Sequence, residues 1–412
     1  MIKRIFIIAA VFCLVLFISA CKKTESDKNV KQNTPEETNT SQIQSDDLQA
    51  LSLASDLPAC PADTSQIFTV PFMDEGLPLR IIPLGNSNES GHVVPVDHIY
   101  PYAGEYTAEV PVYAPSDMTL IWVEIKQKYY KSDDSLIGND YQINMVPCRG
   151  INLSMVHYTK LSPKLAAAVH EENLNCSQEK TEEDEQSWYY TCHPNFDRIQ
   201  LKAGEIIGYM GKLGPKNMHV DYGLYDYNKP ALGFANPDRY YTFTNHAYCL
   251  TDYYTPELKA KYSALFGDMR SQGSDTQVFV AKTTEPVCGK IMYDIPGTAA
   301  GNWFKNPVTT KNVTDNNNAM ILIHDNVETQ YAKFTVSNVT GFWFIPKHAG
   351  LIDREYSEVT ADGKVYCYDD NRTNGQEKIL LQLIDDTHIQ IEQQLGRCGA
   401  SESFQNPITY ER

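Results

Sequence analysis

The sequence predicts a mainly β protein in two parts, and three observations support this. The chain has 412 residues, more than one domain usually holds. Short runs with β-like composition, separated by turn residues, recur along most of it. Tyrosine, with 26 residues, is abundant, and its amphipathic ring suits half-buried strand surfaces. We expect a β-domain at 58–250, a helical connector at 251–273 and an antiparallel β-barrel or sandwich at 274–412.

The first twenty residues have the pattern of a secretory signal peptide. Lys3 and Arg4 precede an apolar run at 5–18 that is too short to span a bilayer, and two small residues follow it. The tetrapeptide at 18–21 resembles the lipobox of bacterial lipoproteins, which implies that Cys21 carries the lipid. A plain signal peptide or an uncleaved anchor is the alternative. The resemblance implies an exported protein held on a membrane, the outer one if the cell has two.

The composition of residues 21–57 predicts a flexible stalk, because the segment is polar, lacks aromatic residues and shows no apolar period.

The whole chain is acidic, with 52 acidic and 35 basic residues and a net charge of −17. A general nucleic-acid binder needs a basic face, so we expect no nucleic-acid partner.

Eight cysteines remain once Cys13 in the signal peptide and Cys21 are set aside. An even number in an exported protein predicts disulfide bonds. We expect Cys176 to pair with Cys192 across a polar excursion, and Cys288 to pair with Cys367 or Cys398 inside the last domain.

The β-domain is defined by runs at 110–114, 119–126, 151–156 and 205–210, and a charged insertion at about 163–200 interrupts it. In the connector, Thr255 is placed to cap a helix that begins at Pro256 and ends before Gly267. The C-terminal part shows eight strand-like runs, which are 277–281, 290–293, 319–324, 332–336, 341–346, 364–368, 379–383 and 388–393.

Two segments of the β-domain carry a family resemblance. VPVYAPSD at 110–117 and LKAGEIIGYMG at 201–211 resemble the lysostaphin/LytM-type zinc endopeptidases, whose fold is the duplicated hybrid motif. The resemblance covers residues 85–226. It implies a metal held by His92, Asp97 and Asp221, with His157 and His219 as acid/base groups. An alternative alignment places 158–161 on the family's middle histidine motif and leaves His157 out.

The geometry of β-strands supports part of this set of proposed site residues. Residues two apart on a strand point to one face, so His219 and Asp221 share a surface that His157 could join from a neighbouring strand. The chain departs from the family where Asp221 replaces a histidine and where the His92–Asp97 spacing is one residue longer. One imidazole and two carboxylates make a poorer zinc site than the family's own. The structural alternative is that His92, His98, His157 and His219 are ordinary strand or loop histidines.

These observations predict a cell-envelope protein with a degenerate metallopeptidase-like domain. We expect it to bind peptidoglycan or another envelope polymer with little or no catalysis and without a metal. The first alternative is an active zinc endopeptidase or amidase that cleaves cell-wall peptides, with one zinc or another divalent cation. The second alternative is a module that contacts other envelope proteins through its tyrosine-rich surface.

Overall fold

The computed structural model describes residues 45–412 except 78, 88–91, 104–107, 215, 218, 273–275, 306–317, 338–339 and 371–375. The predicted signal peptide, Cys21 and the stalk up to residue 44 lie outside the described residues. All described residues belong to one compact unit. No helix in the described part of the chain is long and apolar enough to cross a membrane.

The stalk prediction is wrong for residues 45–57, which belong to the folded body. Helix α1 (Ser45–Ser52) contributes Leu48 to a small apolar cluster, which Leu57 joins. Ile121 and Trp122 of the main sheet form the other side of this cluster. Burial of these leucines outweighs the ordering cost of a polar segment, which composition alone does not reveal.

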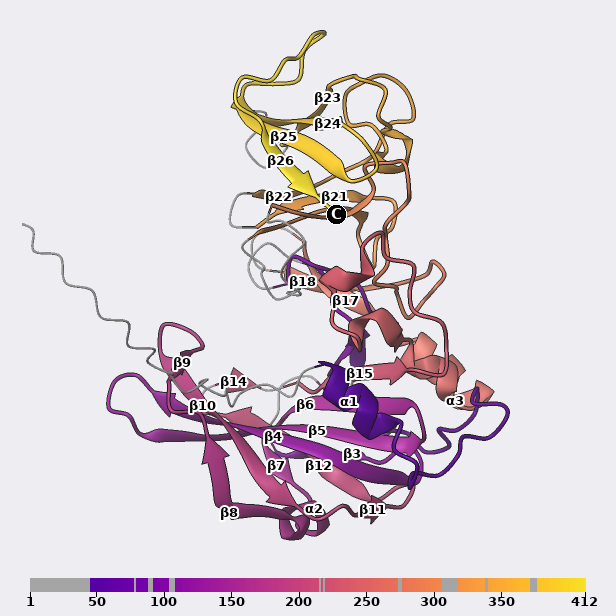
Figure 1. Ribbon diagram of the computed structural model, residues 1–412, viewed down its shortest axis with the longest axis vertical. Coiled ribbons are helices and arrows are strands. Elements are labelled where there is room, and N and C mark those ends of the chain that lie inside the picture. The colour runs from indigo at the N-terminus through magenta and orange to yellow at the C-terminus, as the bar shows by residue number, and fades with distance from the viewer. Residues whose placement is uncertain are drawn as a thin grey trace, which may run out of the picture. The chain divides into compact units, whose positions relative to one another are not determined.

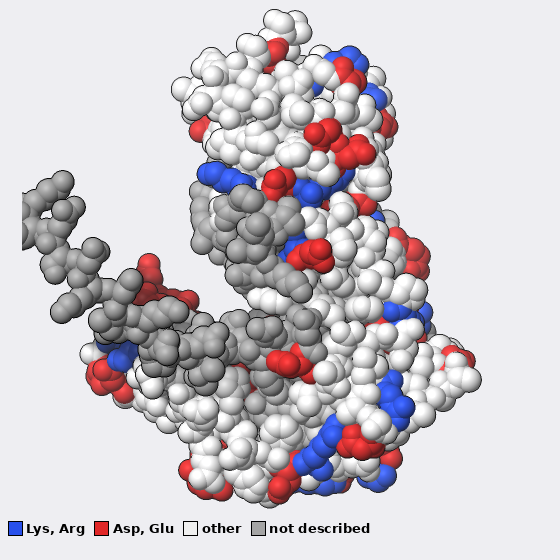
Figure 2. All heavy atoms as spheres, viewed as in Figure 1, with Lys and Arg blue, Asp and Glu red and all other residues white. Residues whose placement is uncertain are grey.

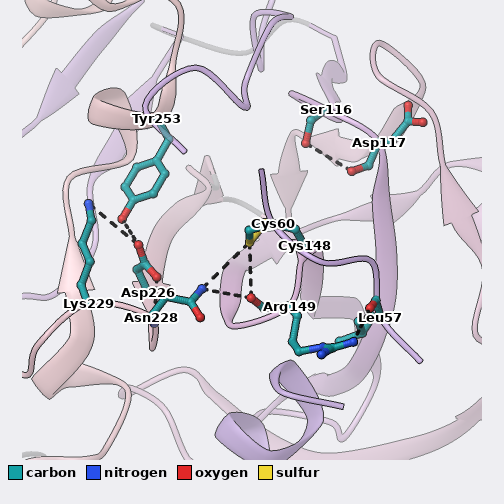
Figure 3. The surroundings of a disulfide bond; sticks show 10 residues. All are labelled: Leu57, Cys60, Ser116, Asp117, Cys148, Arg149, Asp226, Asn228, Lys229 and Tyr253. Atoms are coloured by element: carbon teal, nitrogen blue, oxygen red, sulfur yellow. Dashed lines mark hydrogen bonds and ion pairs between the residues drawn. A yellow bond between two sulfur atoms is a disulfide. The ribbon is translucent and has the colours of Figure 1, made fainter. Parts of the chain in front are cut away.

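A disulfide fixes the end of this segment to the sheet. Cys60 is bonded to Cys148, and the next residue, Arg149, donates from Nη2 to the carbonyl oxygen of Leu57 at 3.1 Å. Asn228 donates to the carbonyl oxygen of Arg149 at 3.0 Å, so a third segment joins this corner (Figure 3). The disulfide closes a loop with a sequence separation of 88 residues.

The largest sheet is antiparallel and has nine strands, and its main path runs β16-β15-β6-β5-β4-β10-β8 (Figure 1). Two long strands form its centre, and most of their residues are buried or half-buried. The strands are β4 (Met118–Tyr130), β5 (Leu136–Cys148), β6 (Ile151–Tyr158), β8 (Val169–Cys176), β9 (Thr181–Glu182), β10 (Ser187–Phe196), β11 (Gln200–Leu201), β15 (Asp221–Asp226) and β16 (Ala247–Tyr248).

Smaller sheets accompany it. The two family-like segments pair with each other in one of them, because β12 lies between β3 and β7. The strands of these small sheets are β1 (Arg80–Ile82), β2 (Tyr100–Tyr102), β3 (Val110–Tyr113), β7 (Lys160–Leu161), β12 (Ile206–Met210), β13 (Lys212–Leu213) and β14 (Lys216–Asn217).

The segment at 163–200, expected as a solvated insertion, contributes to the main sheet. It begins with helix α2 (Pro163–Ala168) and continues through β8, β9 and β10. β10 pairs with β4 on one side and with β8 on the other. The predicted disulfide between Cys176 and Cys192 is confirmed, and the two residues are direct partners across β8 and β10.

The connector contains the expected helix, α3 (Pro256–Ser263), which buries Leu258 and Tyr262. Thr255 precedes it but makes no side-chain capping hydrogen bond. The 3₁₀ helices η1 (Pro237–Arg239), η2 (Thr244–His246) and η3 (Leu250–Tyr253) precede α3. The hairpin of β17 (Gly267–Gln272) and β18 (Thr276–Ala281) follows it, so strands resume earlier than the predicted end at 273.

The C-terminal part forms an eight-stranded antiparallel sheet that curls into a half-barrel, in the order β22-β21-β20-β19-β26-β25-β24-β23 (Figure 1). The expected run at 277–281 pairs with β17 instead, and 290–293 forms no strand. The sheet comprises β19 (Gly301–Phe304), β20 (Ala319–His324), β21 (Ala332–Val336), β22 (Thr340–Phe344), β23 (Tyr366–Asp369), β24 (Glu377–Leu383), β25 (His388–Leu395) and β26 (Ile408–Glu411), with η5 (Tyr356–Glu358) between β22 and β23.

β20 shows why one unit contains both sheets. Its alternate residues Ile321 and Ile323 belong to the large core that includes the first sheet, whereas Met320 and Leu322 face the core of the half-barrel. A strand buried on both faces has the continuous apolar run seen at 319–323.

The predicted pairing of Cys288 with Cys367 or Cys398 is wrong. Cys288 is bonded to Cys249, and Cys367 is bonded to Cys398. The reason is that Cys288 lies in the large core around the first sheet, whereas Cys367 lies on β23 of the half-barrel.

Candidate functional site

Backbone pairing brings three segments of the β-domain to one place. β15 begins at Asp221, which is the partner of Val156 at the end of β6. Tyr222 forms a β-bridge with Ile99, which places the segment at 97–98 beside the same strand end. His157 has a positive φ of 73°, uncommon for a residue with a side chain, near a register shift between β5 and β6.

Three imidazoles converge on the carboxylate of Asp221. His98 Nε2 lies 3.4 Å from Oδ2, His157 Nε2 lies 3.3 Å from the same oxygen, and His219 Nε2 lies 3.4 Å from Oδ1. We call His98, His157, His219 and Asp221 the histidine–aspartate cluster. Their side chains are between 13% and 30% exposed, so the cluster is recessed but open to solvent.

Two of the imidazoles are held from behind by further carboxylates. Asp97 lies 3.1 Å from Nδ1 of His98 and accepts a hydrogen bond from Thr244 at 2.7 Å. Asp140 lies 2.9 Å from Nδ1 of His157. These contacts fix the direction in which Nε2 of each ring points, toward Asp221.

Asp140 is itself paired with a buried lysine. Nζ of Lys128 lies 2.8 Å from Asp140 and 2.8 Å from Glu183, and the lysine side chain is only 5% exposed. The long strands β4 and β5 therefore position His157 through a chain of charges. A charge buried this deeply is stable only with such partners.

The charges around Asp221 set the protonation of two imidazoles. Burial alone would lower the pKa of His98, but the negative charges of Asp221 and Asp97 outweigh it and raise the pKa to about 10. Burial likewise opposes the charged form of His157, yet hydrogen bonds to Asp140 and Asp221 raise its pKa to about 9. Both rings are therefore cationic at neutral pH, and they hold the pKa of Asp221 far below its usual range despite its burial.

His92 and His219 behave differently. Burial and neighbouring imidazoles lower the pKa of both side chains, so they are neutral at pH 7. His219 stacks on Tyr102 with ring centroids 4.6 Å apart, and Tyr100 packs edge-on against His98 at 4.8 Å. The cluster thus combines cationic and neutral imidazoles with two tyrosine rings.

The structure brings some of the predicted site residues together and leaves others apart. His157, His219 and Asp221 come together at the cluster. Asp97 contacts His98 and Thr244, and the exposed ring of His92 lies 6.3 Å from that of His98. We expected Asp97 as a ligand beside Asp221, but its contacts with His98 and Thr244 make it a support for an imidazole.

Sequence reasoning missed three members of this network, which are His98, Asp140 and Lys128. His98 was visible as part of the Asp-His dipeptide just before β2. Asp140 and Lys128 lie on long strands without a motif, so only the pairing of β4, β5 and β6 identifies them.

The fit of a metal ion to this site depends on two observations. Ligands of a tetrahedral zinc ion with bonds near 2.0–2.1 Å stand about 3.3–3.4 Å apart, and charge-assisted hydrogen bonds are about 2.7–2.9 Å long. The three Nε2–oxygen distances match the first value, and the buried atoms His98 Nε2 and Asp221 Oδ1 have no hydrogen-bond partner among the described residues. However, no three His, Cys, Asp or Glu side chains of the described residues form a group that could hold a metal ion. A cation would therefore require the side chains to move and two imidazoles to lose protons.

Comparisons with known proteins add no relative. The chain matches no protein-family description, no curated protein and no solved structure.

Proposed function

We propose that this chain is an exported, lipid-anchored protein of the cell envelope. It binds an envelope polymer at the histidine–aspartate cluster, with little or no catalysis, and peptidoglycan is the polymer we favour. One observation supports this most directly. Asp221 faces two imidazoles whose pKa values are about 10 and about 9. A protonated imidazole is neither a metal ligand nor a general base, but it is a strong hydrogen-bond donor.

The surroundings of the cluster suit a polar polymer. Amide and hydroxyl groups of a peptide or sugar can accept from cationic imidazoles and donate to a carboxylate. The half-buried ring of Tyr102 stacks on His219 and adds apolar surface beside the cluster for the less polar side of such a ligand, whereas Tyr100 is only 5% exposed. The choice of peptidoglycan rests on the family resemblance of 110–117 and 201–211 alone.

The test is a binding assay of the mature chain to purified, insoluble peptidoglycan. We expect Asp221→Asn to weaken binding by about tenfold or more, because one lost charge-assisted contact costs about 1.5–3 kcal/mol. The matched control is His388→Gln, whose imidazole pairs with Asp385 at 3.0 Å on the half-barrel, and it should bind normally. Equal binding by wild type and Asp221→Asn would exclude the cluster as the binding site.

The second candidate is a zinc endopeptidase or amidase. Two features favour it: the convergence of three Nε2 atoms, and the two buried atoms that have no hydrogen bond among the described residues. His98, His157, His219 and Asp221 would hold the ion, which would supply Lewis-acid polarisation and an acidified water. Stoichiometric zinc by elemental analysis, together with chelator-sensitive cleavage of cell-wall peptides, would replace the first proposal with this one.

A further inference from the structure

A cavity of about 330 Å³ lies beside the half-barrel, away from the histidine–aspartate cluster. β20 contributes Leu322 and His324 to its wall, and η5 contributes Tyr356. The segment after β18 contributes Lys282 and Lys290. The volume is at the lower end of the range for small-molecule sites, and the mixture of apolar wall and few polar groups is typical of them.

The acidic groups of the cavity wall already have partners. Glu355 lies 3.0 Å from Nε2 of His324, and that hydrogen bond raises the pKa of the imidazole. Asp325 accepts two hydrogen bonds from Arg270, at 2.9 and 3.1 Å. Glu285 accepts from a backbone N–H at 3.1 Å.

The two lysines of the wall are compensated only weakly, because Asp325 and Glu285 attract the ammonium of Lys282 from beyond ion-pair distance. Lys282 is only 6% exposed, and its ammonium group donates a hydrogen bond to the hydroxyl of Thr284 at 3.3 Å. Lys290 lies over the ring of Tyr293, 4.8 Å from the centroid. Within the part of the chain that the structure describes, neither ammonium group forms an ion pair with a carboxylate. Burial lowers the pKa of Lys282, so an anion nearby would stabilise its charged form.

We propose that this cavity binds a small organic carboxylate with an apolar body, whose carboxylate pairs with Lys282 and Lys290 and whose body packs on Ile295 and Tyr293, two apolar wall residues that are not fully buried. On the face drawn in Figure 2, acidic and basic side chains lie beside one another. The ammonium groups of Lys282 and Lys290, by contrast, are close enough to repel each other and form no ion pair among the described residues, which is unusual in a chain of net charge −17. A buried lysine is expected to have an ion-paired anion, and among the described residues the wall carboxylates attract Lys282 without reaching ion-pair distance. The site is independent of the polymer-binding proposal, because it shares no residue with the cluster.

The test is calorimetric titration of the full mature chain with 2-naphthoate, with 2-naphthamide as the neutral isostere and inorganic phosphate as the anion without an apolar body. We expect 2-naphthoate to bind and the other two to bind at least about tenfold more weakly, since each tenfold reflects about 1.4 kcal/mol. Equal affinity for the amide would overturn the role of charge. Tighter binding of phosphate, or no binding of 2-naphthoate at millimolar concentration, would overturn the choice of ligand.

Variants locate the site. Lys282→Met should weaken 2-naphthoate binding by about tenfold or more, as removal of one partner from a buried charge pair does. Lys290→Met removes an exposed ammonium and should weaken binding about threefold to tenfold, so it decides the question if the Lys282 variant does not fold. The control is Lys347→Met, an exposed lysine paired with Asp353, which should leave the affinity unchanged. Unchanged binding in both cavity variants would refute the proposal.

Discussion

Replacing Asp221 with asparagine removes the carboxylate that three imidazoles share. Asn keeps the shape of the side chain but carries no charge, so the attraction that raises the pKa of His98 to about 10 and of His157 to about 9 is largely lost. Burial then dominates for His98, and we expect its pKa to fall by at least about two units, toward or below the ordinary value near 6.5. His157 should fall less, because Asp140 remains 2.9 Å away.

These shifts also predict how stability depends on pH. A histidine whose folded pKa exceeds its unfolded value stabilises the protein fully below the unfolded pKa, and this contribution is lost as pH rises through the folded pKa. For His98 the window is therefore about pH 6.5 to about 10. The shift from 6.5 to about 10 is worth at most about 5 kcal/mol, and we expect about 2–3 kcal/mol of it to disappear between pH 6 and pH 9, since the side chain is 20% exposed.

Two measurements check this reasoning. Side-chain ¹H–¹⁵N NMR should show no titration of His98 or His157 between pH 5 and pH 8 in the wild type, and titration of His98 inside or below that range in Asp221→Asn. Denaturant unfolding with intact disulfides should show wild-type stability falling from pH 6 to pH 9, with a smaller fall in the variant. Wild-type imidazoles that titrate near pH 6.5 would refute the ion-paired description of the cluster.

Three further perturbations test the fold that holds the site. Lys128→Met should destabilise the protein by about 3–5 kcal/mol in denaturant unfolding, because it leaves Asp140 buried without its ammonium partner; a cost below about 1 kcal/mol would contradict this. Removing the disulfide by Cys60→Ala/Cys148→Ala should cost about 2–5 kcal/mol, given the long loop it closes, and unchanged thermal unfolding would contradict that role. Gly289→Ala should lower the yield of folded protein, since φ is +82° and an added Cβ would clash with the backbone carbonyl oxygen of Leu84; a normal melting temperature would show that the backbone adjusts.

Alternation and turn residues were enough to predict most of the β structure. The runs at 110–114 and 205–210 became β3 and β12, and six of the eight C-terminal runs became strands of the half-barrel. The sequence could not predict α1, because the few leucines of 45–57 stabilise the segment only through their contacts with the main sheet, and those contacts are not visible in the sequence. It also could not assign Cys288, because disulfide pairing depends on which core each segment joins.

The candidate site was predictable where strand geometry was local. His219 and Asp221 are two residues apart, and the structure places their side chains 3.4 Å from each other. The contact of Asp140 with His157 depends instead on the register between β5 and β6, which is shifted by an irregularity near the site. His98 was not predicted as a site residue, because the family motif aligned with His92 and Asp97. The sequence nevertheless shows that His98 directly follows Asp97.

The histidine–aspartate cluster contributes less to the stability of the fold than apolar residues would, and this favours a functional role for it. Half-buried carboxylates and imidazoles, together with a positive φ at His157, stabilise a fold less than apolar side chains of the same volume would. The two candidate functions then differ in the sign of their pH dependence, since a proton and a cation compete for the same lone pair on each Nε2. Zinc binding must release the protons of His98 and His157, so it strengthens as pH rises from 6 toward 9. Polymer binding by cationic imidazoles stays constant up to about pH 8 and weakens only above it, as His157 and then His98 lose their protons, so one titration of each ligand against pH separates the two functions.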